Sequence, residues 1–314
     1  MLKDVIIPDD RKKRFIFFSG KGGVGKTTVS ASTAVWLADQ GYRTLIVSTD
    51  LQLSLNDVFE QHISSKGTNI AGISNLTAVS IDGAESIDRH RQKMMKTLKV
   101  LEPDSFLLKQ MEIDKTIDCG SAQAAVFELS EYLNNDEYDA IVFDNAPTGV
   151  HLEKIMAQSK YVLAMTTQVE KRKKLVETLG EQEVERQIKA IEEIKQKDEQ
   201  AIENLRSEKT SFIMVMIPEA LPLAELERNI PVLEEGYKIP VRGIVINNVL
   251  FPEERKATDF WKTRWRMQKK YIDLTYQKFK NKEIGKAPVL EEEVFGIDKL
   301  RIVGNTLYGG EKDV

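Results

Sequence analysis

The amino-acid sequence predicts an α/β fold built on a doubly wound, mostly parallel sheet, and three observations support this prediction. Short apolar runs of strand length recur along the chain. Segments with the helical spacing of apolar residues lie between these runs. A glycine-rich loop joins the first run to the first helical segment. Such alternation is typical of βαβ units, whose parallel strands lie between two layers of helices.

The first fifty residues predict one complete βαβ unit. Residues 14–18 (RFIFF) form an apolar run that is closely followed by Gly20, as is typical of a buried parallel strand. Residues 27–40 have helical spacing, and Gly41 is placed to end that helix. Residues 44–47 then predict the second strand.

The rest of the chain repeats this pattern, with two insertions. We expect further strands at 76–81, 140–143, 161–165, 211–217 and 243–247. Residues 85–135 have a helical, Met- and Leu-rich pattern, and residues 152–208 include a highly charged stretch from 169 that predicts a long solvated helix or hairpin. We interpret both as helical insertions, forming a subdomain within a single domain that spans 1–314.

Composition excludes several classes of protein. The 314 residues carry 45 Lys and Arg against 49 Asp and Glu, and a net charge of −4 argues against nucleic acid as an obligatory partner. A single cysteine, Cys119, allows no internal disulfide and no four-thiolate metal site. The amino terminus is too polar for a signal peptide, and the apolar runs are far shorter than the ~20 residues of a membrane span. We therefore expect a cytoplasmic protein, with transient contact at a membrane if its partner is there.

The most specific motif is a phosphate-binding loop. The sequence GKGGVGKTT satisfies G-x-x-x-x-G-K-[ST] between a predicted strand and a predicted helix, which is the context that this motif requires. Glycines let successive backbone N–H groups point at phosphate oxygens, and the start of a helix attracts anions. The structural alternative is a glycine-rich turn that binds no ligand. The loop comprises Gly20, Lys21, Gly22, Gly23, Val24, Gly25, Lys26, Thr27 and Thr28.

Several side chains are expected to act on a bound triphosphate. Lys26 is expected to bridge the β- and γ-phosphates, and the Thr27 hydroxyl to coordinate Mg²⁺. Asp144, at the end of a predicted strand, is expected to hold Mg²⁺ through water. Asp50, at the end of the second strand, could activate the attacking water, although a helix N-cap is the alternative role. Residues 145–149 (NAPTG) suit a switch that senses the γ-phosphate.

The sequence resembles the ArsA family of ATPases along nearly its whole length. The resemblance rests on GKGGVGKTT, on STD at 48–50, on FDNAPTG at 143–149 and on further segments in the family's order. This family includes arsenite-pump ATPases and the Get-pathway ATPases that target tail-anchored membrane proteins. It implies a P-loop NTPase fold, ATP and Mg²⁺ as ligands, and a homodimer. In its deviant form of the loop, Lys21 reaches the partner's phosphates; a solvated lysine is the alternative.

The resemblance also implies roles for individual residues. Asp50 would activate the water, and Glu219 would lie at the nucleotide pocket. Asn247 would contact adenine, although the adjacent Asn248 could compete for that role. A loop near Pro288 would close over the base.

Departures from the family pattern narrow the function. The family's D-P-A-H is Asp50-Leu51-Gln52-Leu53 here, and in switch II Asn145 replaces a threonine while His151 comes one residue late. The stretch that carries a zinc-binding C-x-x-C in targeting ATPases has no cysteine, so no zinc is expected. One cysteine per chain also disfavours a three-thiolate arsenite site.

Three functions remain in competition. The first is an ATP-driven carrier of hydrophobic membrane-protein segments, which also contacts a membrane receptor. Its Met- and Leu-rich insertion, with Met94, Met95 and Met111, would bind the cargo or merely pack its own helices. The second is the ATPase of an arsenite efflux pump. The third is a partition or positioning (ParA- or MinD-like) ATPase, for which a basic run at 262–270 could bind DNA, although we expect Trp261, Trp265 and Tyr271 there to pack against the core.

Overall fold

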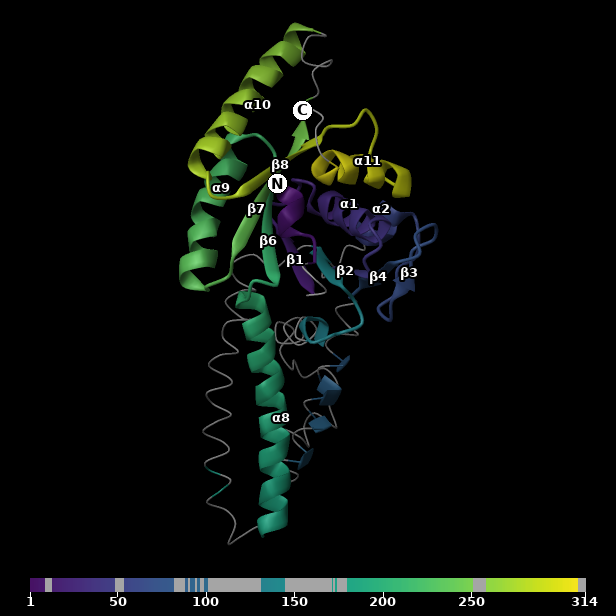
Figure 1. Ribbon diagram of the computed structural model, residues 1–314, viewed down its shortest axis with the longest axis vertical. Coiled ribbons are helices and arrows are strands. Elements are labelled where there is room, and N and C mark those ends of the chain that lie inside the picture. Colours follow the sequence, from purple (N-terminus) through teal and green to yellow (C-terminus); the bar gives the residue numbers. More distant parts are fainter. Residues whose placement is uncertain are drawn as a thin grey trace. The chain divides into compact units, whose positions relative to one another are not determined.

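A computed structural model describes most of the chain (Figure 1). The switch segments and much of the two insertions lie outside the described residues. The described residues are 1–8, 13–48, 54–81, 131–144, 180–250 and 258–309, with short stretches between 88 and 100 and residues 171 and 173. The chain divides into two compact units. Unit 1 comprises 1–81, 136–149 and 206–314, and unit 2 comprises 82–135 and 150–205.

The described strands of unit 1 form one eight-stranded sheet in the order β3-β4-β2-β5-β1-β6-β7-β8. Neighbouring strands run parallel except for β3, which pairs with β4 in the antiparallel direction. This arrangement confirms the predicted doubly wound, mostly parallel α/β fold. The strands are β1 Arg14–Ser19, β2 Thr44–Ser48, β3 Thr68–Asn69, β4 Leu76–Ser80, β5 Ala140–Asp144, β6 Thr210–Met216, β7 Val241–Val249 and β8 Glu283–Pro288.

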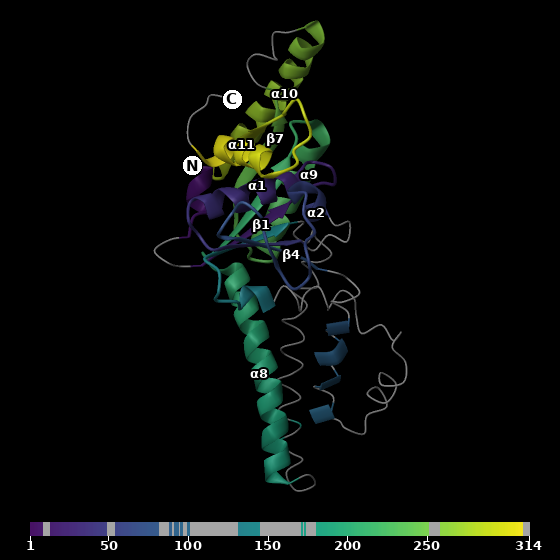
Figure 2. The same cartoon turned by 90° about the vertical axis from the view of Figure 1, so that its right-hand side faces the viewer.

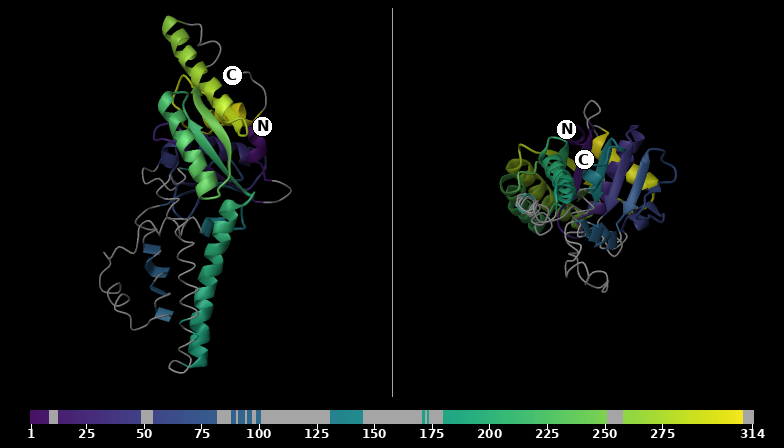
Figure 3. Two further views of the ribbon diagram at one scale, coloured as in Figure 1. Left: turned by 90° about the vertical axis from the view of Figure 1, so that its left-hand side faces the viewer. Right: turned by 90° about the horizontal axis from the view of Figure 1, so that it is seen from below.

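Helices cover both faces of this sheet. In Figure 2, α1 and α11 lie side by side on one face. The left panel of Figure 3 shows the other face, where α9 and α10 lie, in green and yellow-green. The described helices of unit 1 are α1 Lys26–Asp39, α2 Ser54–Phe59, α9 Ala220–Pro231, α10 Asp259–Lys278 and α11 Ile297–Tyr308, with short turns η1 Leu2–Val5 and η2 Val232–Gly236.

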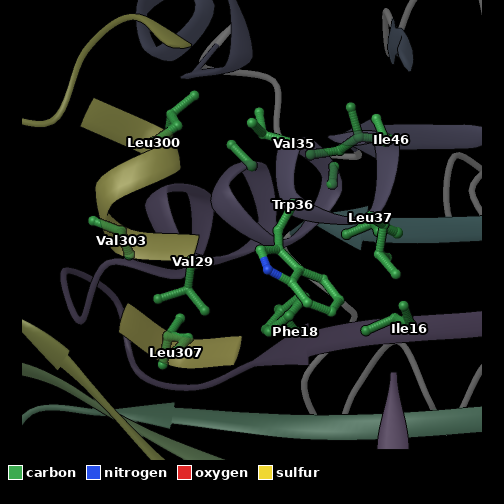
Figure 4. Close-up of a cluster of buried hydrophobic side chains, with 14 of the residues drawn as sticks. Ile16, Phe18, Val29, Val35, Trp36, Leu37, Ile46, Leu300, Val303 and Leu307 are labelled. Atoms are coloured by element: carbon green, nitrogen blue, oxygen red, sulfur yellow. The ribbon is translucent and has the colours of Figure 1, made fainter. Parts of the chain in front are cut away.

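The core on the α1 and α11 face joins strands to helices through apolar side chains (Figure 4). Ile16 and Phe18 of β1 are fully buried, as are Val35 and Leu37 of α1. Because successive strand residues point to opposite faces, Phe17 belongs to the other side of the sheet. There its ring stacks on Phe143 and Phe212 of the neighbouring strands, with centroids 4.3 and 4.7 Å apart. Strands buried on both faces explain why β1 has no polar alternation.

Close packing fixes α11 against α1. A Cβ atom on Gly304 would lie only 2.8 Å from the backbone oxygen of Ser32, so only glycine allows this approach. The hydroxyls of Thr33 and Tyr308 share a 2.6 Å hydrogen bond in the same interface. Burial raises the pKa of the Tyr308 phenol, against the opposing effect of the hydrogen bond to Thr33. The start of α1, which carries the phosphate loop, is thereby held by the core.

The predicted elements mostly coincide with the observed ones. The strands expected at 14–18, 44–47, 76–81, 140–143, 211–217 and 243–247 are confirmed within one or two residues, as is the first helix. Gly41 has the left-handed φ of 92° expected of the residue that ends that helix. Strands β3 and β8 were not predicted, and the strand expected at 161–165 lies outside the described residues.

Unit 2 contains the long helix α8, Glu181–Arg206, whose last residue belongs to unit 1. Its apolar stripe is thin: Val184 and Ile191 are buried, whereas most of its charged residues are exposed. The side-chain amide of Asn204 donates to the backbone oxygen of Leu133 over 3.0 Å, so residues 131–133 pack along α8. For the charged stretch, which predicted a long solvated helix or hairpin, a helix is confirmed over 181–206, and most of residues 169–179 lie outside the described residues.

The methionines proposed to bind cargo are mostly outside the described part of the chain. Met95 is half-buried in a helical stretch, while Met94 and Met111 lie outside the described residues. None of the described helices has the length and apolar composition that crossing a bilayer requires.

Candidate functional site

The glycine-rich loop follows β1 at the carboxyl end of the sheet, which we define as the end where the parallel strands finish. A Cβ atom on Gly20 would lie 2.2 Å from the backbone oxygen of Val215, so the first glycine lets the loop leave β1 against β6. Gly23 and Gly25 have φ of 80° and 89°, a conformation that favours glycine. At Gly22 and Gly23, no described atom lies within 4 Å of an added Cβ, so the outer side of the loop has room for a ligand.

The helix that follows presents its amino end to this space. Gly25 is the N-cap of α1, and Lys26, Thr27 and Thr28 form the first turn, each only partly buried. The first N–H groups of a helix have no partner within the helix and attract anions. The Lys26 ammonium donates to the backbone oxygen of Lys21 over 3.2 Å, which places its positive charge over the loop. Lys21 itself is exposed.

Asp144 and Thr27 meet around the hydroxyl of Ser30. Asp144 is the last residue of β5 and is fully buried. Ser30 Oγ lies 2.9 Å from Asp144 Oδ1 and 3.0 Å from the backbone oxygen of Thr27, and its proton can go to either acceptor. Sequence reasoning missed Ser30. Its spacing of three from Thr27, on the same face of α1, is the signal that could have found it.

These oxygen donors fit a magnesium ion. Mg²⁺ prefers carboxylate, hydroxyl and phosphate oxygens and usually keeps several waters. A buried carboxylate beside the threonine of a phosphate loop supplies this kind of donor at the carboxyl end of adjacent strands. The Thr27 hydroxyl and the Asp144 carboxylate are the side chains that would hold the ion, and an ion there would neutralise charge on a bound triphosphate.

Asn247 links β7 to the phosphate loop. Its side chain is 6% exposed, and its Nδ2 donates to the backbone oxygen of Val24 over 2.9 Å. A Cβ on Gly25 would lie 2.2 Å from the same Nδ2, so this contact also requires glycine there. The bond leaves Asn247 Oδ1 as an acceptor for another group. Asn248, with a φ of 57°, is exposed.

A cavity of about 320 Å³ lies at the carboxyl ends of β6, β7 and β8, next to the start of α10. Its lining combines apolar groups with a few polar ones, including Asn248, Glu219 and Arg264. Arg264 Nη2 donates to Glu219 Oε1 over 2.7 Å, so the charges of these two side chains offset each other. Trp261 also lines the cavity and is 37% exposed. The expectation that Trp261 packs against the core is therefore wrong, because Trp261 is among the exposed large apolar residues of the described chain. Trp265 and Tyr271 are half-buried.

Gln268 anchors α10 to the end of β7. Its side chain is 4% exposed. Its Nε2 donates to the backbone oxygen of Asn248 over 2.8 Å, and its Oε1 accepts from the backbone N–H of Leu250 over 3.0 Å. No pattern in the sequence singled out Gln268, because its partners lie 18 and 20 residues away in the chain.

The remaining predicted residues are placed as follows. Pro288 is the buried last residue of β8, beside Val249 of β7. Asp50 and its neighbours to residue 53 lie outside the described residues, as do residues 145–151 and Cys119. The structure thus brings the phosphate loop, Thr27, Asp144 and Asn247 together, with Glu219 and Pro288 at the neighbouring strand ends.

A parallel sheet whose first strand runs into such a loop, with an aspartate at the end of the adjacent strand, defines a P-loop nucleotide-binding protein. The chain belongs to the ArsA family, whose model, described as anion-transporting ATPase, matches residues 13–309. Members of this family hydrolyse ATP, and this chain is such an ATPase.

Relatives with curated names cover nearly the whole chain. It is 33% identical over 311 residues to an arsenical pump-driving ATPase of Halobacterium salinarum, matching 99% of this chain but 46% of that protein, so the chain spans about half its length. It is 32% identical to ATPase ASNA1 homolog 1 of Paramecium tetraurelia, over 96% of this chain and 93% of that one. It is also 31% identical to ATPase GET3 of Rhodotorula glutinis, over 93% and 87%.

Proposed function

We propose that two copies of this chain bind Mg²⁺ and ATP at their phosphate loops and use hydrolysis to bind and release hydrophobic segments of tail-anchored membrane proteins. The observation that carries the proposal is the loop itself, with open space outside Gly22 and Gly23 and the Lys26 ammonium over it. Relatives named ATPase GET3 and ASNA1 homolog, matched over most of their length, favour the targeting branch of the family.

In this proposal each residue near the loop has one task. Lys26 and the N–H groups of the loop bind and orient the phosphates. Asp144 and Thr27 hold the metal, and Ser30 orients the Asp144 carboxylate. Asn247 fixes the loop through its hydrogen bond to the Val24 backbone oxygen, and its Oδ1 would accept a hydrogen bond from the base. Asp50 accepts the proton of the attacking water.

Coupling to cargo involves the segments around the loop. Lys21 would reach the phosphates of the partner copy, and residues 145–149 would follow the γ-phosphate. The two helical insertions, 85–135 and 152–208, would change arrangement with nucleotide state and expose apolar surface to the cargo. We assign these events to the cytoplasm, with transient contact at a membrane receptor.

Two substitutions test the nucleotide site. Lys26→Ala should lower ATP turnover by about 10²-fold or more, because it removes a charged donor from the phosphates. Asp50→Asn should leave ATP binding intact and lower hydrolysis by about 10²-fold or more, the typical effect of a lost acid–base group. Lys280→Ala, at an exposed lysine, is the control. Near-normal turnover in both site variants would contradict the proposal.

Cargo is tested by co-purification from the native host with the Asp50→Asn variant. Tail-anchored membrane proteins in the purified material would support the proposed function, and exclusively soluble clients would contradict it. Equilibrium sedimentation with Mg²⁺ and a non-hydrolysable ATP analogue tests the homodimer, which the proposal requires under those conditions.

A second candidate is the ATPase of an arsenite pump, which the name of the Halobacterium relative favours. The single cysteine of this chain opposes it, since a two-fold dimer supplies only two thiols. Stimulation of ATP turnover by arsenite would support this candidate, and we expect none. A salt-dependent shift of DNA by the protein would instead favour a partition or positioning ATPase.

A further inference from the structure

Strand β7 contains a β-bulge close to its carboxyl end. Between Ile246 and Val249 the strand advances by three residues, while its partner β8 advances by two. The two residues inside this interval, Asn247 and Asn248, therefore share a place that one residue would fill in a regular ladder. Bulges next to functional sites often change the direction of a side chain, and Asn247 is the side chain of β7 that bonds the phosphate loop.

The sheet itself gives this bulge little support. Strand β6 ends at Met216, which pairs with Ile246, so β7 extends beyond its other neighbour at this point. In the described sheet neither Asn247 nor Asn248 has a register partner on β6 or β8. Asn248 also has a φ of 57°, a left-handed conformation that is uncommon outside glycine. The shape of the bulge therefore depends on contacts from elsewhere in the fold.

Gln268 of α10 supplies those contacts. Its Nε2 donates to the backbone oxygen of Asn248 over 2.8 Å, and its Oε1 accepts from the backbone N–H of Leu250 over 3.0 Å. One side-chain amide thus takes the place of the donor and the acceptor that a neighbouring strand would offer. The side chain of Gln268 is 4% exposed, so water does not compete strongly for either bond. Gln268 fixes the backbone directly after Asn247.

The other side of the bulge contacts the phosphate loop. Asn247 Nδ2 donates to the backbone oxygen of Val24 over 2.9 Å, and the Asn247 side chain is 6% exposed. The same Nδ2 would lie 2.2 Å from a Cβ atom on Gly25, so the amide and the loop backbone are in close contact. A shift of β7 at Asn247 would therefore move the loop or break its bond to Val24.

We propose that Gln268 is a positioning residue of the nucleotide site. By holding the bulge of β7, it keeps the Asn247 amide on the Val24 carbonyl and the phosphate loop in the shape that receives phosphates. The inference rests on the proposed nucleotide site and adds α10 to it as a support of the loop. A glutamine with a merely structural role would contribute to the free energy of unfolding and leave the affinity for phosphates unchanged.

The test is equilibrium binding of inorganic tripolyphosphate and of ATP, each with Mg²⁺, to the full-length protein. Tripolyphosphate has no base, so its affinity reports on the phosphate loop. Gln268→Met keeps the length of the side chain and removes both hydrogen bonds. It should weaken both ligands by the same factor, about fivefold, which corresponds to one lost hydrogen bond in the loop. The KM for ATP should rise by that factor, with kcat changed by less than about twofold.

A double-mutant cycle shows whether Gln268 acts through Asn247. Asn247→Ala alone should also weaken tripolyphosphate binding. Adding Gln268→Met to Asn247→Ala should change the affinity by less than about twofold, because the link to the loop is already broken. Thr275→Val is the matched control, at a fully buried residue of α10 whose hydroxyl donates to the backbone oxygen of Tyr271 over 2.7 Å. It should lower the urea midpoint and leave both affinities unchanged.

The possible failures are distinguishable. If the wild-type protein binds both ligands, and Gln268→Met leaves tripolyphosphate affinity unchanged or adds fully to Asn247→Ala, the positioning role is wrong while the nucleotide site stands. If Gln268→Met does not fold, Asn248→Ala decides, because it strains the same bulge at an exposed residue with positive φ. Unchanged tripolyphosphate affinity in that variant would contradict the proposal.

Failure of the nucleotide site itself gives a different result. If the wild-type protein binds neither ligand, or Lys26→Ala binds both as well as the wild type does, the proposed nucleotide site fails, and the inference fails with it.

Discussion

The charged side chains at the two ends of the central sheet differ in what surrounds them. At the amino end, where the parallel strands begin, Arg14 donates to the backbone oxygens of Ile7 and Glu208 over 3.2 and 2.6 Å. Arg242 donates to the same Glu208 oxygen and to Thr210, over 3.3 and 2.9 Å. At the carboxyl end, by contrast, the Lys26 ammonium lies on an exposed loop with open space beside it.

The difference separates stability from binding. Cations at the amino end satisfy the carbonyl groups of the protein itself, so their removal should cost stability and leave the ligand site intact. Glycines and the lysine at the carboxyl end are arranged for an anion that the chain does not supply. This agrees with the general rule that ligands of open α/β sheets bind outside the carboxyl ends of the strands.

The largest effect is expected at the first loop glycine. Gly20→Ala should lower the free energy of unfolding by about 3 kcal/mol and abolish ATP binding, because its Cβ would lie 2.2 Å from the Val215 backbone. Gly22→Ala should change the free energy of unfolding by less than about 0.5 kcal/mol, since no described atom lies within 4 Å of an added Cβ. It should nevertheless weaken ATP binding, because the added methyl group would occupy the space open to the ligand. Urea unfolding and ATP titration measure both. Equal losses of stability in the two variants would contradict the assignment of a packing role to Gly20 and a ligand-binding role to Gly22.

The next effect is at the opposite end of the sheet. Arg14 is 6% exposed, and Arg14→Ala should lower the free energy of unfolding by about 2 kcal/mol, because it removes a buried charged donor from the backbone oxygens of Ile7 and Glu208. The KM for ATP should stay as in the wild type. Arg242→Ala removes a half-buried arginine that binds the same Glu208 oxygen, and it should lower the free energy of unfolding by less than Arg14→Ala does. A large increase in KM without loss of stability would contradict the comparison.

A smaller effect is expected from Ser30. Ser30→Ala removes the 2.9 Å bond to Asp144 and should lower ATP turnover about fivefold, equivalent to about 1 kcal/mol for one hydrogen bond. If Ser30 orients the carboxylate toward a metal, the Mg²⁺ concentration for half-maximal turnover should rise. Turnover that falls with no change in the Mg²⁺ requirement would show that Ser30 acts in another way.

The smallest effect concerns acid stability at the amino end. The hydrogen bond from Arg43 holds the pKa of Asp139 below its ordinary value of 3.8. Because this pKa is lower in the folded state, the pair stabilises the protein above pH 3.8, and the contribution is lost as pH falls through the depressed value. Arg43→Gln should therefore lower the urea midpoint at pH 7, with the difference from wild type narrowing in acid. A difference that widens in acid would contradict this sign.

The core of the fold was predictable because its strands are buried on both faces. In β1, Phe17 and Phe18 pack on opposite faces of the sheet, so its sequence is a continuous apolar run. A strand with one exposed face would instead alternate apolar and polar residues. Strand β8 was missed because its sequence, EIGKAP, has no apolar run. It lies at the edge of the described sheet and pairs only with β7. Strand β3 has two residues, too few for a pattern.

The site was predictable where its residues are close together in the sequence. The loop motif carries its own context, and Asp144 is marked by the strand that it ends. Contacts between distant segments gave no such signal: Ser30 bonds a residue 114 positions away, and Asn247 bonds one 223 positions away. The cavity beside Trp261 arises from three strand ends and a helix, which only the folded chain brings together.

Hydrogen exchange with Mg²⁺ and a non-hydrolysable ATP analogue tests most directly whether the nucleotide binds only at the carboxyl end of the sheet. We predict that the analogue slows exchange at residues 20–28 and 247–250, and leaves the backbone at 13–15, 207–210 and 241–243 unchanged. Equal protection at both ends, or protection at the amino end alone, would contradict the account.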